Sequence, residues 1–207
     1  MRQWIGGGCD GFLQAADSTC GRKSIWINET GFATVPGRSE RQQATWWVRA
    51  VATFLSHPRI EHIGVYEIKD LPPDRAAIGD APNYHLGLTR TDRSKKLAFY
   101  TVDMLTDLVD VGQLEILDRD MAVTGASDAK AHLFQRPDGD RVLFLWTGTG
   151  PVTISVRLNT PGAAAIEYEL DGRTVSYEQF DGTTIRGIAL AGGEPRIFRI
   201  QSAPTLK

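Results

Sequence analysis

The spacing of apolar residues changes about halfway along this 207-residue chain, and the change limits the folds open to it. In the first half, apolar runs at residues 24–29 and 61–68 have the β-branched and aromatic composition of buried strands. One helix is expected after the capping box formed by Ser39 and Gln42, and a second over residues 94–109. This strand–helix–strand–helix order predicts parallel pairing through right-handed crossovers.

After about residue 113 the pattern becomes that of antiparallel β structure. Residues 152–158 alternate between apolar and polar side chains, so one face of this strand is expected to be buried and the other solvated. Turn signals such as Asp171-Gly172 separate the short runs. We therefore expect an α/β part in residues 1–113 and a small antiparallel β-sandwich in residues 114–207. The expected strands of the sandwich cover residues 133–136, 141–146, 152–158, 165–170, 174–180, 184–190 and 196–200.

Charge and composition exclude several functional classes. The chain has 23 Lys and Arg against 25 Asp and Glu, so no basic surplus is available for nucleic acid or an anionic membrane. No apolar run approaches the roughly 20 residues that a spanning helix needs. The first five residues are followed directly by Gly6, Gly7 and Gly8, so the apolar stretch of a signal peptide is not seen. The sequence thus predicts a soluble globular protein without nucleic-acid or membrane partners.

The cysteines and histidines give little sign of a metal or cofactor. Cys9 and Cys20 are the only cysteines, and the four histidines are scattered along the chain. Without a Cys-x-x-Cys spacing, a structural zinc site is not expected. A disulfide between the two cysteines would suit an extracytoplasmic protein, and two reduced thiols are the alternative. We predict no metal and no cofactor.

The sharpest chemical signal is a carboxylate at the end of the first apolar run. The segment 25–32 reads Ile-Trp-Ile-Asn-Glu-Thr-Gly-Phe, so Glu29 closes a strand directly before a glycine-containing loop. In a parallel α/β barrel, such strand ends form the catalytic face. Strand alternation puts Ile25, Ile27 and Glu29 on one side. Burying a glutamate without a partner is costly, so Glu29 is expected in a polar active-site cleft, and a surface carboxylate is the alternative.

This segment resembles strand seven of retaining glycoside hydrolases that are built on eight-stranded α/β barrels. Within that group it is most similar to the xylosidase-, iduronidase- and exopolysaccharide-hydrolase-like families. Residues 65–70 (Val-Tyr-Glu-Ile-Lys-Asp) resemble strand eight, and residues 85–88 with 94–100 resemble the loop and lysine-marked helix start that close the barrel. The resemblance covers residues 22–110 and implies the last two strand–helix units of a TIM-type barrel, followed by a β domain that matches by architecture only.

The resemblance also implies a role for each matching residue. Glu29 would be the nucleophile, and Tyr66 would line the subsite beside the scissile bond of a carbohydrate substrate. Asn28, Lys69 and Asp70 are expected to contribute to substrate binding. These families suit an extracytoplasmic location, although the chain shows no signal peptide.

One catalytic group is missing from this assignment. Retaining hydrolysis needs two carboxyl groups about 5–5.5 Å apart, and the acid/base glutamate that ends strand four has no counterpart here. Glu67 is not expected to replace it, because strand alternation places Glu67 on the face opposite Tyr66. Only 28 residues precede Glu29, too few for six strand–helix units. We expect the N-terminal part of the barrel to come from a longer parent protein or a separate chain, and the isolated chain to be inactive.

An alternative from another functional class remains open at this point. The chain could be a non-catalytic carbohydrate-binding or interaction module in which the β-sandwich is the working part. Four aromatic residues would then supply a platform for sugar rings, although aromatic residues on alternating strands are usually core. They are Trp146, Tyr168, Tyr177 and Phe180.

Overall fold

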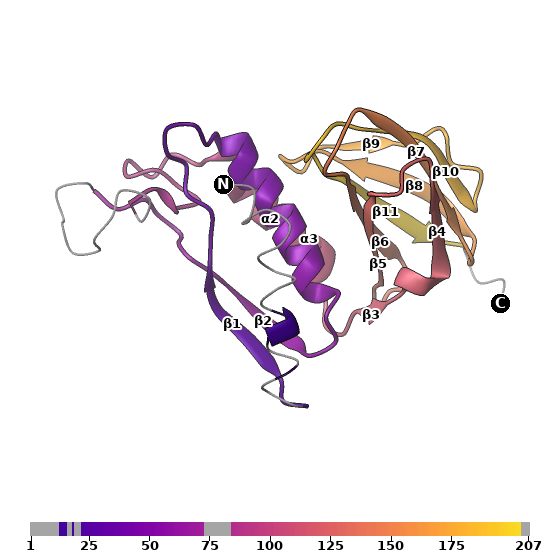
Figure 1. Ribbon diagram of the computed structural model, residues 1–207, viewed down its shortest axis with the longest axis horizontal. Helices are drawn as coiled ribbons and strands as arrows, with labels where there is room; N and C mark the ends of the chain where they lie inside the picture. Colours follow the sequence, from indigo (N-terminus) through magenta and orange to yellow (C-terminus); the bar gives the residue numbers. More distant parts are fainter. Residues whose placement is uncertain (1–12, 16–17, 19–21, 73–83, 204–207) are drawn as a thin grey trace. The chain divides into compact units, whose positions relative to one another are not determined.

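A computed structural model describes residues 13–15, 18, 22–72 and 84–203 of the chain. Cys9, Cys20 and the glycines at 6–8 lie outside the described residues, so the disulfide stays a prediction. Two compact units make up the chain, Met1–Asp103 and Met104–Lys207, and each is described by itself below (Figure 1). In the part of the chain that the structure describes, no helix combines the length and apolar character needed to cross a membrane.

The first unit, called the α/β unit here, is organised around two parallel strands. β1 (Ile25–Thr30) pairs with β2 (Ile60–Val65), and α2 (Glu40–Leu55) joins them, as Figure 1 shows. Ile25 and Ile27 are buried on one face of this sheet, whereas Trp26 between them is 65% exposed. The predicted strand–helix–strand order and the parallel pairing are confirmed. The predicted extent of the second strand, residues 61–68, is wrong at its end, because β2 stops at Val65.

Helix α2 begins where its capping residues predict. The Ser39 hydroxyl accepts from the Gln42 amide at 3.2 Å, and the Gln42 side chain accepts from the Ser39 amide at 2.7 Å. These two bonds form the predicted capping box, which satisfies amides that lack partners within the helix. Trp47 and Val48 lie on the fully buried side of the helix, so its tryptophans belong to the core.

The second unit, called the β unit here, contains two antiparallel sheets with a shared hydrophobic core. The strand order is β10–β7–β4 in one sheet and β3–β5–β6–β11–β8–β9 in the other. Val156 from the first sheet and Leu143 and Phe198 from the second belong to one buried cluster. The elements are β3 (Glu115–Ile116), η3 (Asp118–Asp120), β4 (Met121–Thr124), β5 (Lys130–Gln135), β6 (Arg141–Trp146), β7 (Val152–Leu158), β8 (Gly162–Tyr168), β9 (Thr174–Ser176), β10 (Thr184–Leu190) and β11 (Arg196–Ser202).

The predicted strands agree with the β unit unevenly. Those at 141–146, 152–158 and 184–190 coincide with β6, β7 and β10. The prediction at 174–180 is wrong in extent, because β9 has three residues at the edge of its sheet. β3 and β4 were not predicted, since runs of two and four residues are too short to show a period. The sheet is therefore wider than the sequence pattern indicates.

Helix α3 (Leu97–Val109) begins in the α/β unit and ends in the β unit. Its predicted start at about residue 94 is three residues early. Arg136, which follows β5, donates from Nη1 to the carbonyl oxygens of Asp107 at 2.9 Å and Leu108 at 2.5 Å. Carbonyl groups in the last turn of a helix have no partner within the helix, so this buried guanidinium caps α3.

Arg136→Ala should lower the free energy of unfolding of the β unit by about 2 kcal/mol, because it leaves buried carbonyl groups without donors. Chemical denaturation followed by circular dichroism measures this change. Arg173→Ala is the matched control, since Arg173 pairs with Asp171 at the surface and its removal should leave stability unchanged. Equal effects of the two substitutions would contradict the capping role of Arg136.

Candidate functional site

Glu29 lies at the carboxyl end of β1, where its side chain is exposed, as is that of Asn28. Ile25 and Ile27 are buried, so the prediction that they share a face with Glu29 is not supported by burial. The pairing with β2 shifts register between Ile27 and Thr30. Strict alternation of side chains therefore does not extend to the end of the strand, and Glu29 is accessible to a ligand.

Tyr66 lies beside this strand end. It directly follows β2, it is partly buried, and its amide donates to the Thr30 carbonyl at 2.8 Å. Gly31 packs against the Tyr66 carbonyl so closely that a Cβ at Gly31 would overlap that oxygen. The structure thus brings the backbones that follow Glu29 and precede Glu67 into direct contact, at the carboxyl ends of two parallel strands.

Glu67 is a carboxyl group whose surroundings are unusual. It is half-buried, and its Oε1 has no hydrogen-bond partner among the residues that the structure describes. Burial raises the pKa of the Glu67 carboxyl, the nearby Asp70 carboxylate raises it further, and Lys96 opposes both effects. Since β2 ends at Val65, strand alternation does not describe Tyr66 and Glu67.

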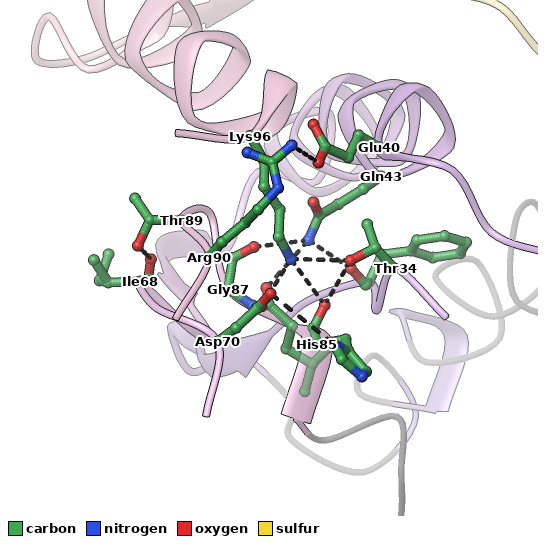
Figure 2. A network of polar contacts seen from close by, with 12 residues as sticks. Thr34, Glu40, Gln43, Ile68, Asp70, His85, Gly87, Thr89, Arg90 and Lys96 are labelled. Carbon is green, nitrogen blue, oxygen red and sulfur yellow. Dashed lines mark hydrogen bonds and ion pairs between the residues drawn. The ribbon is translucent and has the colours of Figure 1, made fainter. Parts of the chain in front are cut away.

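A buried ion pair joins Asp70, in the segment that follows β2, to Lys96, which directly precedes α3 (Figure 2). Lys96 is only 1% exposed, and Asp70 is 6% exposed. The Nζ of Lys96 lies 2.7 Å from Oδ1 of Asp70. Lys96 also donates to the Thr34 hydroxyl at 2.9 Å and approaches the His85 carbonyl at 3.4 Å. The Gly87 amide donates to the same Asp70 oxygen at 2.8 Å. Lys96 thus has three acceptors, the number that an ammonium group can serve.

Gln43 on α2 extends this network toward the loops. Its Nε2 lies 2.8 Å from the Phe32 carbonyl and 3.2 Å from the carbonyls of Leu86 and Gly87. The residue is completely buried. One amide group therefore holds the segment that follows β1 against the segment that precedes Lys96, as Figure 2 shows.

Glu40 connects the two helices near the same network. Its Oε2 accepts from the Leu97 amide at 3.2 Å, and its Oε1 forms an ion pair with Arg90. Leu97 is the first residue of α3, so the Glu40 carboxylate satisfies an amide at a helix N-terminus, where negative charge is favourable. The network of Glu40, Gln43, Asp70 and Lys96 thus joins both helices to the loops after β1 and β2.

The residues singled out by the sequence do not all occupy similar positions. Glu29, Asn28 and Lys69 are exposed, Tyr66 is half-buried, and Asp70 is buried with its carboxylate engaged by groups of the chain itself. The network residues Lys96 and Gln43 were missed. Lys95 and Lys96 are indistinguishable in sequence, yet the exposed Lys95 has its Nζ 4.1 Å from the Phe99 ring centre. The lysines at the start of α3 were the one signal in the sequence that could have indicated Lys96.

The aromatic residues of the β unit do not form an open platform. Trp146 is buried, and Tyr168, Tyr177 and Phe180 are partly buried. In the described residues of this unit no aromatic side chain is exposed. The Tyr177 hydroxyl donates to the Arg186 carbonyl at 2.8 Å, within the unit itself. These four residues therefore do not form a platform of exposed rings in the described part of this unit, and the sugar-binding module stays a prediction.

Metal binding has no support in the described part of the chain, where no group of three His, Cys, Asp or Glu side chains could hold an ion.

Comparison of this chain with known proteins finds solved structures with a similar fold. No protein-family model matches the sequence. No curated protein matches it either. The structure is similar to that of a family 39 glycoside hydrolase from the gut symbiont Bacteroides cellulosilyticus WH2, with a TM-score of 0.60 and 16% identity over 86% of this chain and 34% of that chain.

A second similar structure is the GH51 arabinofuranosidase from Xanthomonas axonopodis pv. citri. The TM-score is 0.54 and the identity 13%, over 86% of this chain and 41% of that chain. The chain spans between a third and about two fifths of the length of these two proteins. At such identities the likeness establishes that the fold resembles part of a glycoside hydrolase.

Gly31→Ala tests the close approach of the two strand ends. The added methyl group would meet the Tyr66 carbonyl, so the free energy of unfolding should fall by about 3 kcal/mol. Gly148→Ala is the control, because the nearest atom to a Cβ there is 4.0 Å away. Thermal unfolding of both variants measures the effect, and a stable Gly31→Ala protein would contradict the described contact.

Glu67→Gln tests the environment of the half-buried carboxyl. Because the pKa is raised, the folded chain keeps this proton to a higher pH than the unfolded chain, so ionisation lowers stability as pH rises above the ordinary glutamate range. The neutral variant should be more stable than the native chain at about pH 7 and nearly equal to it at about pH 4. Urea denaturation at both pH values measures this, and a destabilised variant at neutral pH would disprove it.

Proposed function

We propose that this chain is the C-terminal part of a retaining glycoside hydrolase with a TIM-type barrel, and that Glu29 is its nucleophile. One observation carries the proposal. The exposed Glu29 lies at the carboxyl end of the parallel strand β1. Tyr66 directly follows the neighbouring parallel strand β2, and its amide donates to the Thr30 carbonyl at the end of β1. Active sites of α/β barrels form at the carboxyl ends of their strands. The similarity of fold to glycoside hydrolases supports the same assignment.

The proposed reaction assigns a distinct task to each residue. The Glu29 carboxylate attacks the anomeric carbon, the glycosidic bond breaks, the leaving oxygen takes a proton from the acid/base, and a covalent glycosyl-enzyme forms. Water then releases the sugar with retention of configuration. Tyr66 lines the subsite beside the scissile bond, and Asn28 and Lys69 offer polar groups to sugar hydroxyls. Asp70 is buried, so its contribution to substrate binding runs through the loops that it holds.

The acid/base is assigned to a strand outside this chain. In the part of the chain that the structure describes, one face of the two-stranded sheet carries an exposed tryptophan, which supports a missing structural partner. Trp26 is 65% exposed on that face, whereas parallel sheets are usually covered on both faces. The remaining barrel strands, from a longer parent protein or a separate chain, would cover Trp26.

Aryl β-glycoside hydrolysis tests the proposal. The 207-residue chain alone should show no measurable turnover, whereas the chain joined to the remaining strands should be active. If those strands belong to the same protein, an in-frame extension of about 200 residues with an Asn-Glu strand end should lie upstream of the Met1 codon. In the active protein, Glu29→Gln should lower kcat/KM by at least about 10³-fold.

Glu178→Gln is the matched control, because Glu178 is exposed in the β unit. It should leave kcat/KM unchanged. Activity that survives Glu29→Gln would overturn the assignment of the nucleophile. Turnover by the isolated chain that Glu29→Gln abolishes would support the nucleophile and overturn the requirement for further strands.

A further inference from the structure

We infer that Lys96 is a positioning residue, whose ammonium group fixes the loop after Glu29 against the segment after Tyr66. The inference rests on the proposed function for what Glu29 and Tyr66 do, and on the structure for how they are held. Lys96 is 1% exposed, so its role does not include contact with a substrate.

The two segments that Lys96 bridges each start at a proposed site residue. Thr34 lies five residues after Glu29, and Asp70 lies four residues after Tyr66. Lys96 Nζ lies 2.9 Å from the Thr34 hydroxyl and 2.7 Å from Asp70 Oδ1. Figure 2 shows the ammonium group between these two acceptors. A single buried group is therefore bonded to both segments.

Backbone bonds carry this constraint from the loops to the strand ends. The Thr34 amide donates to the His85 carbonyl at 2.9 Å, and the Asp70 amide donates to the Thr89 carbonyl at 2.9 Å. Closer to the site, the Tyr66 amide donates to the Thr30 carbonyl at 2.8 Å, next to Glu29. Loosening the loops at Lys96 would therefore let the two strand ends move.

The charge of Lys96 matters for position more than for stability. Burying an ammonium group is unfavourable unless acceptors surround it, and a well-packed apolar pair often gives equal stability. An apolar pair, however, would fill the same volume without directing Thr34 or Gly87 to a defined place. Misplacement by about 1 Å can reduce a reaction rate 10²-fold, so directional bonds have a function that packing cannot replace.

Amide hydrogen exchange in the 207-residue chain, followed by NMR, tests this role without a substrate. In Lys96→Met, exchange at the amides of Thr34, Gly87 and Tyr66 should accelerate at least about tenfold. The Ile25 amide, bonded to the Arg59 carbonyl at 2.7 Å near the opposite end of the sheet, should keep its rate. Lys95→Met, at the exposed neighbouring lysine, is the matched control and should change none of these rates.

Two further variants separate position from stability. Asp70→Leu combined with Lys96→Met should recover the thermal midpoint of the native chain while exchange at the Thr34 and Gly87 amides stays fast. Thr34→Val leaves the ion pair intact and removes one acceptor, so it keeps the test valid if Lys96→Met does not fold. In that variant, exchange at residues 31 and 34 should accelerate while the Gly87 amide keeps its rate.

Three outcomes would overturn the inference. They are unchanged exchange at these amides, acceleration by one common factor throughout the α/β unit, and recovery of slow exchange in the apolar double variant. Failure of the proposed function would look different. Glycosidase activity that survives Glu29→Gln would remove that function and leave the exchange pattern intact, whereas unchanged exchange would remove the role of Lys96 and leave Glu29 untouched.

Discussion

The buried ion pair between Lys96 and Asp70 is the interaction on which the arrangement of the α/β unit depends. An ammonium group out of water needs acceptors on each of its hydrogens, and here they come from segments that are distant in sequence. Satisfying Lys96 brings the loop after β1, the segment after β2 and the chain around His85 to one place. The amide of Gln43 then adds α2 to the same network.

The two units differ in how the sheets are covered in the part of the chain that the structure describes. The β unit encloses a core between two antiparallel sheets, and its strand β6 is buried along its whole length. The α/β unit instead has a two-stranded parallel sheet with an exposed Trp26 on one face. Under the proposed function, strands outside this chain would cover that face.

Local sequence patterns predicted those parts of the structure that depend on local periodicity. This class includes the capping box at Ser39 and the order β1, α2, β2 with its parallel strand pairing. It also includes the strands β6, β7 and β10. Patterns failed where the backbone leaves regular geometry. The register shift before Thr30 and the end of β2 at Val65 changed the expected surroundings of Glu29 and Glu67. Lys96 and Asp70 are 26 residues apart, so no local period could have paired them.

Covalent trapping tests most directly whether Glu29 forms a bond to a sugar, as we propose. The barrel-complete protein would be incubated with activated 2-deoxy-2-fluoro-β-glycosides, which slow release of the glycosyl-enzyme, and its peptides analysed by mass spectrometry. We predict one added sugar on the peptide that contains Glu29, and none in the Glu29→Gln variant. A sugar attached to any other carboxylate would contradict it.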